Sequence, residues 1–436
     1  MIKNIKQPSL LLTLFIFLCA FPTIRYVVVG RDSISIFDYL FSSLPDVLSI
    51  GVIMFSMISF FAKNKTLSLS KIDKIFIGYF LFSIIYGCIL SRDIKACILG
   101  FRLSYLPMLF YFVGKYIDES KENFSKKYLD PIFSLFGVIG LVGFFLYFFV
   151  PAWNMKIIGN ITGAVNQYLI VRMTSIFWTP VVFGTSMGFT LLYFVHKYFV
   201  SEKITKLNWI FISFSWFGLV LSVSRGPIIC FVLMMLLMFY VFKNTQKTLR
   251  ILILFICLYV ISILFASLQQ QILYNGGNFF SLFYNMVNFT VKSAAETATM
   301  EQGLTRVELW QRSWISFVQQ PWGYGLGKSG HIAWRLFKNT NIPSSPYSTD
   351  GWYLKLLGET GILGAAFFSV LLFYFANRIK KMRLLFDKSI TTFLVLLFIF
   401  VLIQNIVSNV VDYYCIAPLF YMLLGYCTKY FYNEKG

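Results

Sequence analysis

Two short motifs in this chain carry the residues best suited to chemistry. Ser222-Val223-Ser224-Arg225-Gly226 lies between two apolar runs, and Asp350-Gly351 is followed further on by Gly361 and Gly364. The planar guanidinium of arginine binds phosphate oxygens through two parallel hydrogen bonds, which lysine cannot do. A carboxylate at the mouth of a helix can accept a proton. Together these motifs suit chemistry on an anionic, lipid-linked substrate.

Further arginines fall where a positive charge is costly. Arg102 lies several residues inside an apolar run, and Arg172 begins a transition from polar to apolar sequence. Charge held at or inside a membrane bundle is functional by default. The alternative is that such arginines reach lipid headgroups or pair with nearby acids such as Asp93 and Asp412.

Composition sets the fold class that must position these residues. The chain is 58% hydrophobic and only 13% charged, whereas a soluble domain carries about 25% charged residues. Because roughly 20 apolar residues cross a bilayer as a helix, the sequence predicts an all-α integral membrane protein with about twelve transmembrane helices. The expected spans are 9–29, 45–62, 74–90, 97–117, 131–150, 177–199, 207–223, 226–242, 250–268, 353–377, 390–410 and 413–430.

Charge distribution predicts how these spans are oriented. The formal net charge is +20, but the basic residues gather in alternate loops, as in the positive-inside pattern of membrane proteins. This excess indicates topology rather than nucleic-acid binding. We expect both termini in the cytoplasm, one transmembrane domain over 1–436, and a large exterior loop at 269–352 between the ninth and tenth spans.

The large loop contains a second ordered segment. Glu301 to Gln320 has apolar residues at three- and four-residue spacing, which predicts an amphipathic helix on the outer face. We expect Arg306, Glu308 and Arg312 on this helix to face solvent or substrate. Pro321 ends the helix, and Gly323 to Gly327 form a turn; a nucleotide-binding loop is disfavoured there because no strand precedes it.

Asp350 has two interpretations. Ser348-Thr349-Asp350 precedes the tenth span, so Asp350 can be an N-cap worth about 1 kcal/mol. Alternatively it is a base at the membrane surface, ionised at neutral pH because the helix dipole stabilises its charge. Glu308 is the second candidate base. Sugar rings could stack on aromatic side chains, of which Trp310, Trp352 and Tyr347 are the candidates.

Metal or cofactor chemistry finds no support in the sequence. The seven cysteines lie within or beside apolar spans, and the two histidines form no metal-binding spacing. We therefore expect neither a metal nor a cofactor.

Several motifs resemble those of the bacterial O-antigen polymerase and O-antigen ligase superfamily. They run in the family's order: Arg172 with Ile176 to Pro180 and Gly184; Ser224-Arg225-Gly226; Arg306 with Leu309-Trp310, Pro321 and Gly323 to Gly327; and Asp350-Gly351 with Leu357, Glu359, Gly361 and Gly364. The ligases carry an essential histidine where this chain has Asp350, as is usual among the polymerases.

The resemblance implies a metal-independent, inverting membrane glycosyltransferase, similar in type to the polytopic GT-C enzymes. It would transfer a growing glycan from undecaprenyl diphosphate to the non-reducing end of a lipid-linked repeat unit. Arg172, Arg225 and Arg306 would then bind the diphosphate, with Arg102 and Arg312 as further substrate-binding residues. The implied partners are the lipid-linked donor and acceptor, membrane lipids and a chain-length regulator protein, and the implied location is the bacterial inner membrane with the site facing the periplasm.

The sequence is also compatible with two other functions. The first alternative is an O-antigen ligase, which transfers glycan to the lipid A core. His331 in the large loop is a histidine that this function could use. A transporter of lipid-linked sugars would also have many spans, although carriers of that kind usually show two similar halves. Elongation of a glycan in detergent would separate an enzyme from a transporter.

Overall fold

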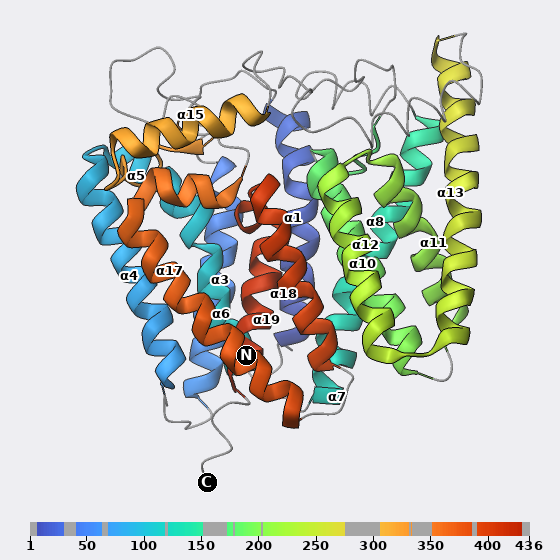
Figure 1. Cartoon of the computed structure of the whole chain (residues 1–436), viewed down its shortest axis with the longest axis horizontal. Coiled ribbons are helices and arrows are strands. Elements are labelled where there is room, and N and C mark those ends of the chain that lie inside the picture. Colours follow the sequence, from blue (N-terminus) through green and yellow to red (C-terminus); the bar gives the residue numbers. More distant parts are fainter. Residues whose placement is uncertain are drawn as a thin grey trace.

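The protein is a bundle of helices. The computed structural model describes residues 7–29, 41–62, 69–117, 121–150, 172–177, 179–201, 204–274, 306–330, 333, 351–385 and 390–429. Within these ranges the structure is helical with no strand, which confirms the all-α part of the predicted fold class. Figure 1 shows most helices running roughly alongside one another, with α15 (Arg306–Gln319) lying across one end. We call this end the α15 end.

Helices occupy each of the predicted apolar stretches. They are α1 (Gln7–Val29), α3 (Leu44–Phe61), α4 (Lys71–Ser91), α5 (Ile94–Gly100) continuing to α6 (Phe110–Tyr116), α8 (Asp130–Phe149), α10 (Pro180–Val200), α11 (Lys206–Leu221), α12 (Arg225–Phe242), α13 (Thr245–Tyr274), α17 (Trp352–Leu385), α18 (Ile390–Val407) and α19 (Ile416–Lys429). In the described part of the chain, nine helices are long and apolar enough to cross a membrane. The number of twelve spans, their sidedness and the extent of the exterior loop stay predictions.

The bundle has two groups of helices joined by α18. Helices α4, α6, α17 and α19 pack together on one side, and α8, α10, α11, α12 and α13 on the other (Figure 1). Helix α18 contacts α17 in the first group and both α10 and α12 in the second. Its end at Val407 therefore lies where residues from both groups can meet.

Glycines allow two helices of the first group to approach closely. A side chain at Gly114 of α6 would collide with the Met422 carbonyl of α19, and one at Gly425 of α19 with the Tyr111 carbonyl of α6. Small residues let membrane helices pack backbone to backbone. These contacts fix α19 against α6.

Helix α17 is broken near its start. Gly361 has φ 61° and ψ −158°, a backbone conformation that L-residues with a side chain rarely adopt. Figure 1 shows the short part before Gly361 lying across the α15 end and the longer part descending through the bundle. The break turns the first part of α17, which follows Asp350 in sequence, into a separate helix at the end of the bundle.

Candidate functional site

Arg172 is held on the turn between α11 and α12. Its Nε donates to the Ser222 carbonyl at 3.0 Å, and its Nη2 donates to Ser224 Oγ at 3.0 Å and to the Val223 carbonyl at 3.4 Å. A further backbone hydrogen bond joins Met173 N to the Leu221 carbonyl at 2.9 Å. These bonds fix the plane of the Arg172 guanidinium.

The same turn leads directly into Arg225. Helix α11 ends at Leu221 and α12 begins at Arg225, and Val223 between them has φ 50°. A left-handed conformation is unusual for a β-branched residue and costs on the order of 1–3 kcal/mol. In this turn the Ser222 and Val223 carbonyls both accept hydrogen bonds from Arg172. The structure thus places Arg172 against the turn that leads into Arg225.

The end of α18 lies between this turn and the residue that follows Asp350. A Cβ on Gly226 would be 3.1 Å from Val407 Cγ2, and one on Gly351 would be 2.6 Å from the Ile406 carbonyl. Gly351 has φ 146°, so this close approach and the backbone both favour glycine. Asp350 itself, like Tyr347, lies outside the described residues. Its neighbour Gly351 nonetheless meets the same helix end as the residue after Arg225.

The glycine turn holds the broken end of α17. Tyr324 N donates to the Gly358 carbonyl at 2.8 Å and Gly325 N to the Glu359 carbonyl at 3.0 Å. Gly327 N donates to Glu359 Oε1 at 3.0 Å. Gly323, Gly325 and Gly327 all have positive φ, which confirms the predicted turn. The Tyr324 and Gly325 N–H groups thus satisfy carbonyls that a helix end leaves without partners.

Sequence reasoning missed a buried ion pair beside this turn. Lys355 Nζ lies 2.7 Å from Asp412 Oδ2 and 2.6 Å from Ser104 Oγ, and Lys355 is 6% exposed. The sequence offers Asp412 as a partner for an arginine, whereas in the structure its partner is Lys355. A charged residue inside an apolar stretch was the available signal. The pair connects the first part of α17 to the loop between α18 and α19.

Arg102 is paired elsewhere at the α15 end. It lies in a π-helical turn, η2 (Phe101–Tyr105), and its Nε is 2.5 Å from Asp46 Oδ2 of α3. Asp93, the other acid considered for arginine pairing, caps α5 by accepting from Ala96 N at 3.1 Å. Substrate binding by Arg102 stays a prediction. A substrate phosphate would have to compete with the Asp46 carboxylate for the Arg102 guanidinium.

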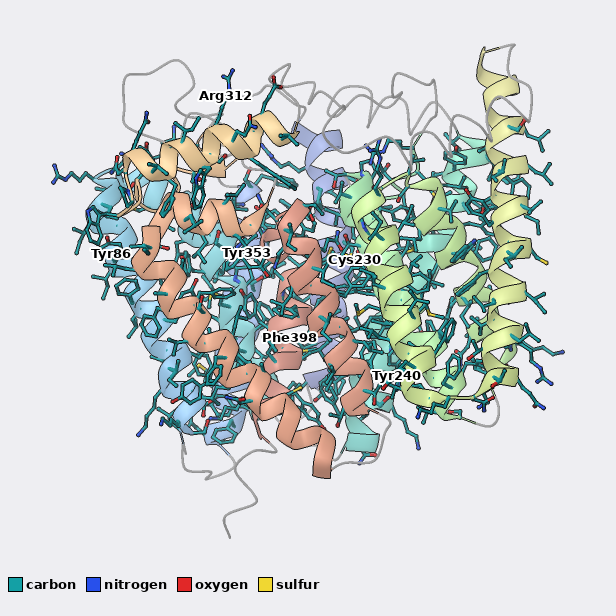
Figure 2. The ribbon with its side chains drawn as sticks, viewed as in Figure 1. Tyr86, Cys230, Tyr240, Arg312, Tyr353 and Phe398 are labelled. Atoms are coloured by element: carbon teal, nitrogen blue, oxygen red, sulfur yellow. The ribbon has the colours of Figure 1, made fainter. Side chains whose placement is uncertain are left out.

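Helix α15 confirms the predicted amphipathic helix within the described residues. Leu309 is buried, whereas Glu308 and Arg312 are exposed, and the Arg312 side chain points away from the bundle (Figure 2). Trp310 is half-buried. Arg306 begins the helix, and its side chain lies outside the described part of the structure.

Trp352 is directed into the bundle. The residue is 6% exposed, and its ring lies 4.8 Å, centroid to centroid, from that of Phe368. Packing of α17 is the role that these contacts support, and stacking on a sugar by Trp352 stays a prediction.

Comparison with known proteins supports the family resemblance. Residues 210–369 match the family described as O-antigen ligase. The matched segment contains the Arg225 turn, α15, the glycine turn and the broken start of α17. A comparison with curated protein sequences gives no significant match.

Proposed function

Since residues 210–369 carry the domain of the O-antigen ligase family, which supports the O-antigen ligase and polymerase superfamily, we propose that this membrane protein is a polysaccharide polymerase. It transfers a growing glycan from undecaprenyl diphosphate to the non-reducing end of a lipid-linked repeat unit. The observation that carries this proposal is the docking of Arg172 on the turn that begins with Ser222 and leads to Arg225.

The two arginines suit the leaving group of this reaction. When the bond between the anomeric carbon and the diphosphate oxygen breaks, its electron pair stays on the diphosphate and negative charge develops there. Positioned guanidiniums stabilise such charge at no cost of reorganisation during the reaction, and each can bind phosphate oxygens through two hydrogen bonds. The bonds from Arg172 to Ser222 and Ser224 provide that prior positioning.

Asp350 is the proposed base. The acceptor hydroxyl attacks the anomeric carbon from the face opposite the diphosphate. The configuration at this carbon is therefore inverted in the new glycosidic bond. Its proton passes to the Asp350 carboxylate and then to water. The approach of Gly351 to the end of α18 supports a location near the Arg225 turn, and Glu308 remains the second candidate.

Asp350 also favours a polymerase over a ligase. The related ligases have a histidine at this place, whereas this chain has an aspartate. The ligase remains the second candidate because the matched family carries its name. The family match gives a transporter no support. We propose a bacterial plasma-membrane location with the site facing the exterior, and a chain-length regulator as a further partner.

The test is polymerisation by the purified protein in detergent. Undecaprenyl diphosphate carrying one oligosaccharide repeat is supplied as both donor and acceptor, and products are separated by size on a gel. We expect a ladder of products that differ by one repeat. A second assay supplies a lipid A core as the acceptor. Transfer to this core without any ladder would establish the ligase, and recovery of unchanged substrate from both assays would contradict both enzymes.

A further inference from the structure

Gln404 is a polar residue buried in the last turn of α18. It is 0% exposed, although most of α18 is apolar. Its Nε2 donates to Thr185 Oγ1 of α10 at 2.6 Å. Within the described part of the chain, its Oε1 is buried and has no hydrogen-bond partner. Because a buried amide oxygen without a donor costs free energy, Oε1 is an acceptor that a donor reaching it would satisfy.

A neighbouring hydrogen bond determines which end of the Gln404 amide is the oxygen. Thr185 Oγ1 donates its own proton to the Val181 carbonyl at 2.8 Å. Since a hydroxyl group has one proton, Thr185 can only accept from Gln404, and the amide atom that faces it must be Nε2. This bond holds the amide in place and leaves Oε1 as the end that can accept.

Gln404 lies against the turn between α11 and α12. A Cβ on Gly226, in the first turn of α12, would be 4.0 Å from Gln404 Cγ. Thr185 directly follows Gly184, where a Cβ would be 2.6 Å from Ser222 Oγ of the same turn. Figure 1 shows α10, α12 and α18 side by side, and each of the three contacts the other two. Gln404 and its partner Thr185 therefore both adjoin this turn.

Arg225 is the side chain of this turn best suited to donate to the amide oxygen. The Ser222 hydroxyl donates to the Leu219 carbonyl at 2.8 Å, and the Ser224 hydroxyl donates to the Ser222 carbonyl at 3.3 Å, so both protons are committed. Arg225 directly precedes Gly226, and its Nη2 is buried. A guanidinium carries five N–H donors, and its hydrogen bonds are strengthened by its charge.

We propose that Gln404 is a positioning residue for Arg225. Its Oε1 accepts a hydrogen bond from the Arg225 guanidinium when that guanidinium binds the diphosphate. The inference rests on the proposed function, in which Arg225 stabilises charge on the leaving diphosphate. Three hydrogen bonds orient Arg172 on the turn, and Gln404 gives Arg225 a fixed acceptor of its own. A guanidinium held in one plane can form two parallel hydrogen bonds to a phosphate.

A double-variant cycle on Gln404 and Arg225 tests this link. Gln404→Met keeps the length of the side chain and removes the amide, so kcat/KM for ladder formation should fall by about 10- to 100-fold, as for loss of a hydrogen bond to a charged group. In Arg225→Lys protein the same change should cost much less, because the guanidinium that Gln404 orients is gone. An equal fall in both backgrounds would show that Gln404 only packs α18 against α10, and would overturn the proposal.

Two further variants guard against a general loss of packing. Ser186→Ala is the matched control, because Ser186 is also buried in α10 and its hydroxyl donates to the Val182 carbonyl of the same helix at 2.9 Å; its rate should stay near normal. Gln404→Glu keeps an oxygen that can accept from Arg225, so it should retain more of the rate per folded molecule than Gln404→Met. A rate no higher than that of Gln404→Met would contradict the positioning role.

Binding of undecaprenyl diphosphate without a glycan separates this proposal from the polymerase. Its dissociation constant, measured by thermophoresis in detergent, should rise by about tenfold in Gln404→Met and change little when Gln404→Met is added to Arg225→Lys. This coupling in a protein that makes no polymer would keep the role of Gln404 and refute the polymerase. A repeat ladder together with additive losses would support the polymerase and refute the role of Gln404.

Discussion

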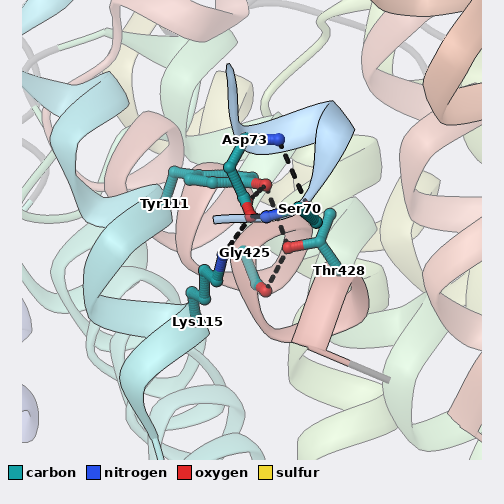
Figure 3. A network of polar contacts seen from close by, with 6 residues as sticks. All are labelled: Ser70, Asp73, Tyr111, Lys115, Gly425 and Thr428. Carbon is teal, nitrogen blue, oxygen red and sulfur yellow. Dashed lines mark hydrogen bonds and ion pairs between the residues drawn. The ribbon is translucent and has the colours of Figure 1, made fainter. Parts of the chain in front are cut away.

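Two regions of the bundle, the cluster around Asp73 and the turn that binds Arg172, hold a charged residue in different ways. At the end opposite α15, Asp73 is 0% exposed and forms an ion pair with Lys115 (Figure 3). It also accepts hydrogen bonds from Ser70 N at 2.6 Å and from the Tyr111 hydroxyl at 2.5 Å. At the α15 end, Arg172 donates to carbonyl and hydroxyl oxygens.

The difference separates a structural cluster from a candidate site. Opposite charges inside the Asp73 cluster balance each other, and Tyr111 extends the network to Thr428 at 2.9 Å. This network joins α4, α6 and α19. The hydrogen bonds from Arg172 to the turn at Ser222 to Ser224 orient its guanidinium at the candidate site. Loss of the first cluster should therefore affect folding, whereas changes at the second should affect chemistry.

The largest effect is expected from removal of the proposed base. Asp350→Asn keeps the ability to cap a helix but cannot accept a proton, so polymerisation should fall by about 10²–10⁴-fold while the membrane level stays the same. Asp350→His should recover part of the rate. Asp93→Asn is the matched control, because Asp93 is an N-cap in the structure. A normal rate for Asp350→Asn would make Glu308 the residue to test.

The second-largest effect is a loss of stability, expected from a change in the Asp73 cluster at the end of the bundle opposite α15. Asp73→Asn leaves the Lys115 charge buried without its carboxylate, and loss of one partner of a buried pair costs about 3–5 kcal/mol. Thermal unfolding in detergent should show a clear loss of stability. Turnover per folded molecule should change little, and a selective loss of turnover would contradict the structural role of this cluster.

The third-largest effect is a loss of polymerisation rate when Arg172 or Arg225 is replaced by lysine. Arg172→Lys and Arg225→Lys keep the charge but lose the planar fork, and loss of a positioned donor to developing charge costs about 10²–10³-fold in rate. Initial rates of ladder formation measure this loss, with Arg250→Lys at the start of α13 as the control. Near-normal rates from both variants would remove these arginines from the mechanism.

The smallest effect is the coupling within the Lys355 and Asp412 pair. Lys355→Met and Asp412→Asn should each destabilise the protein, and the double variant should cost less than the sum of the two. Contacting residues show coupling energies of about 0.5–3 kcal/mol in such cycles. Additive losses in thermal unfolding would mean that the 2.7 Å contact contributes no coupling.

Several features followed from the sequence because they depend on local pattern. Apolar run length predicted the helices, and apolar spacing predicted α15. Glycine spacing predicted the turn at Gly323 to Gly327, since positive φ is easy only for glycine. The residue types also identified Arg172 and Arg225 as candidates, because a charge in an apolar chain is conspicuous.

Only the tertiary structure decided which of these residues meet. Arg172 contacts Ser222, and Lys355 contacts Asp412, across separations of 50 and 57 residues. Apolar periodicity marks a buried face but not the helix that covers it. The partner is chosen by close approach at glycines such as Gly226 and Gly351 and by the need to pair each buried charge. These are properties of the packed bundle, so they determine the site only after the helices have assembled.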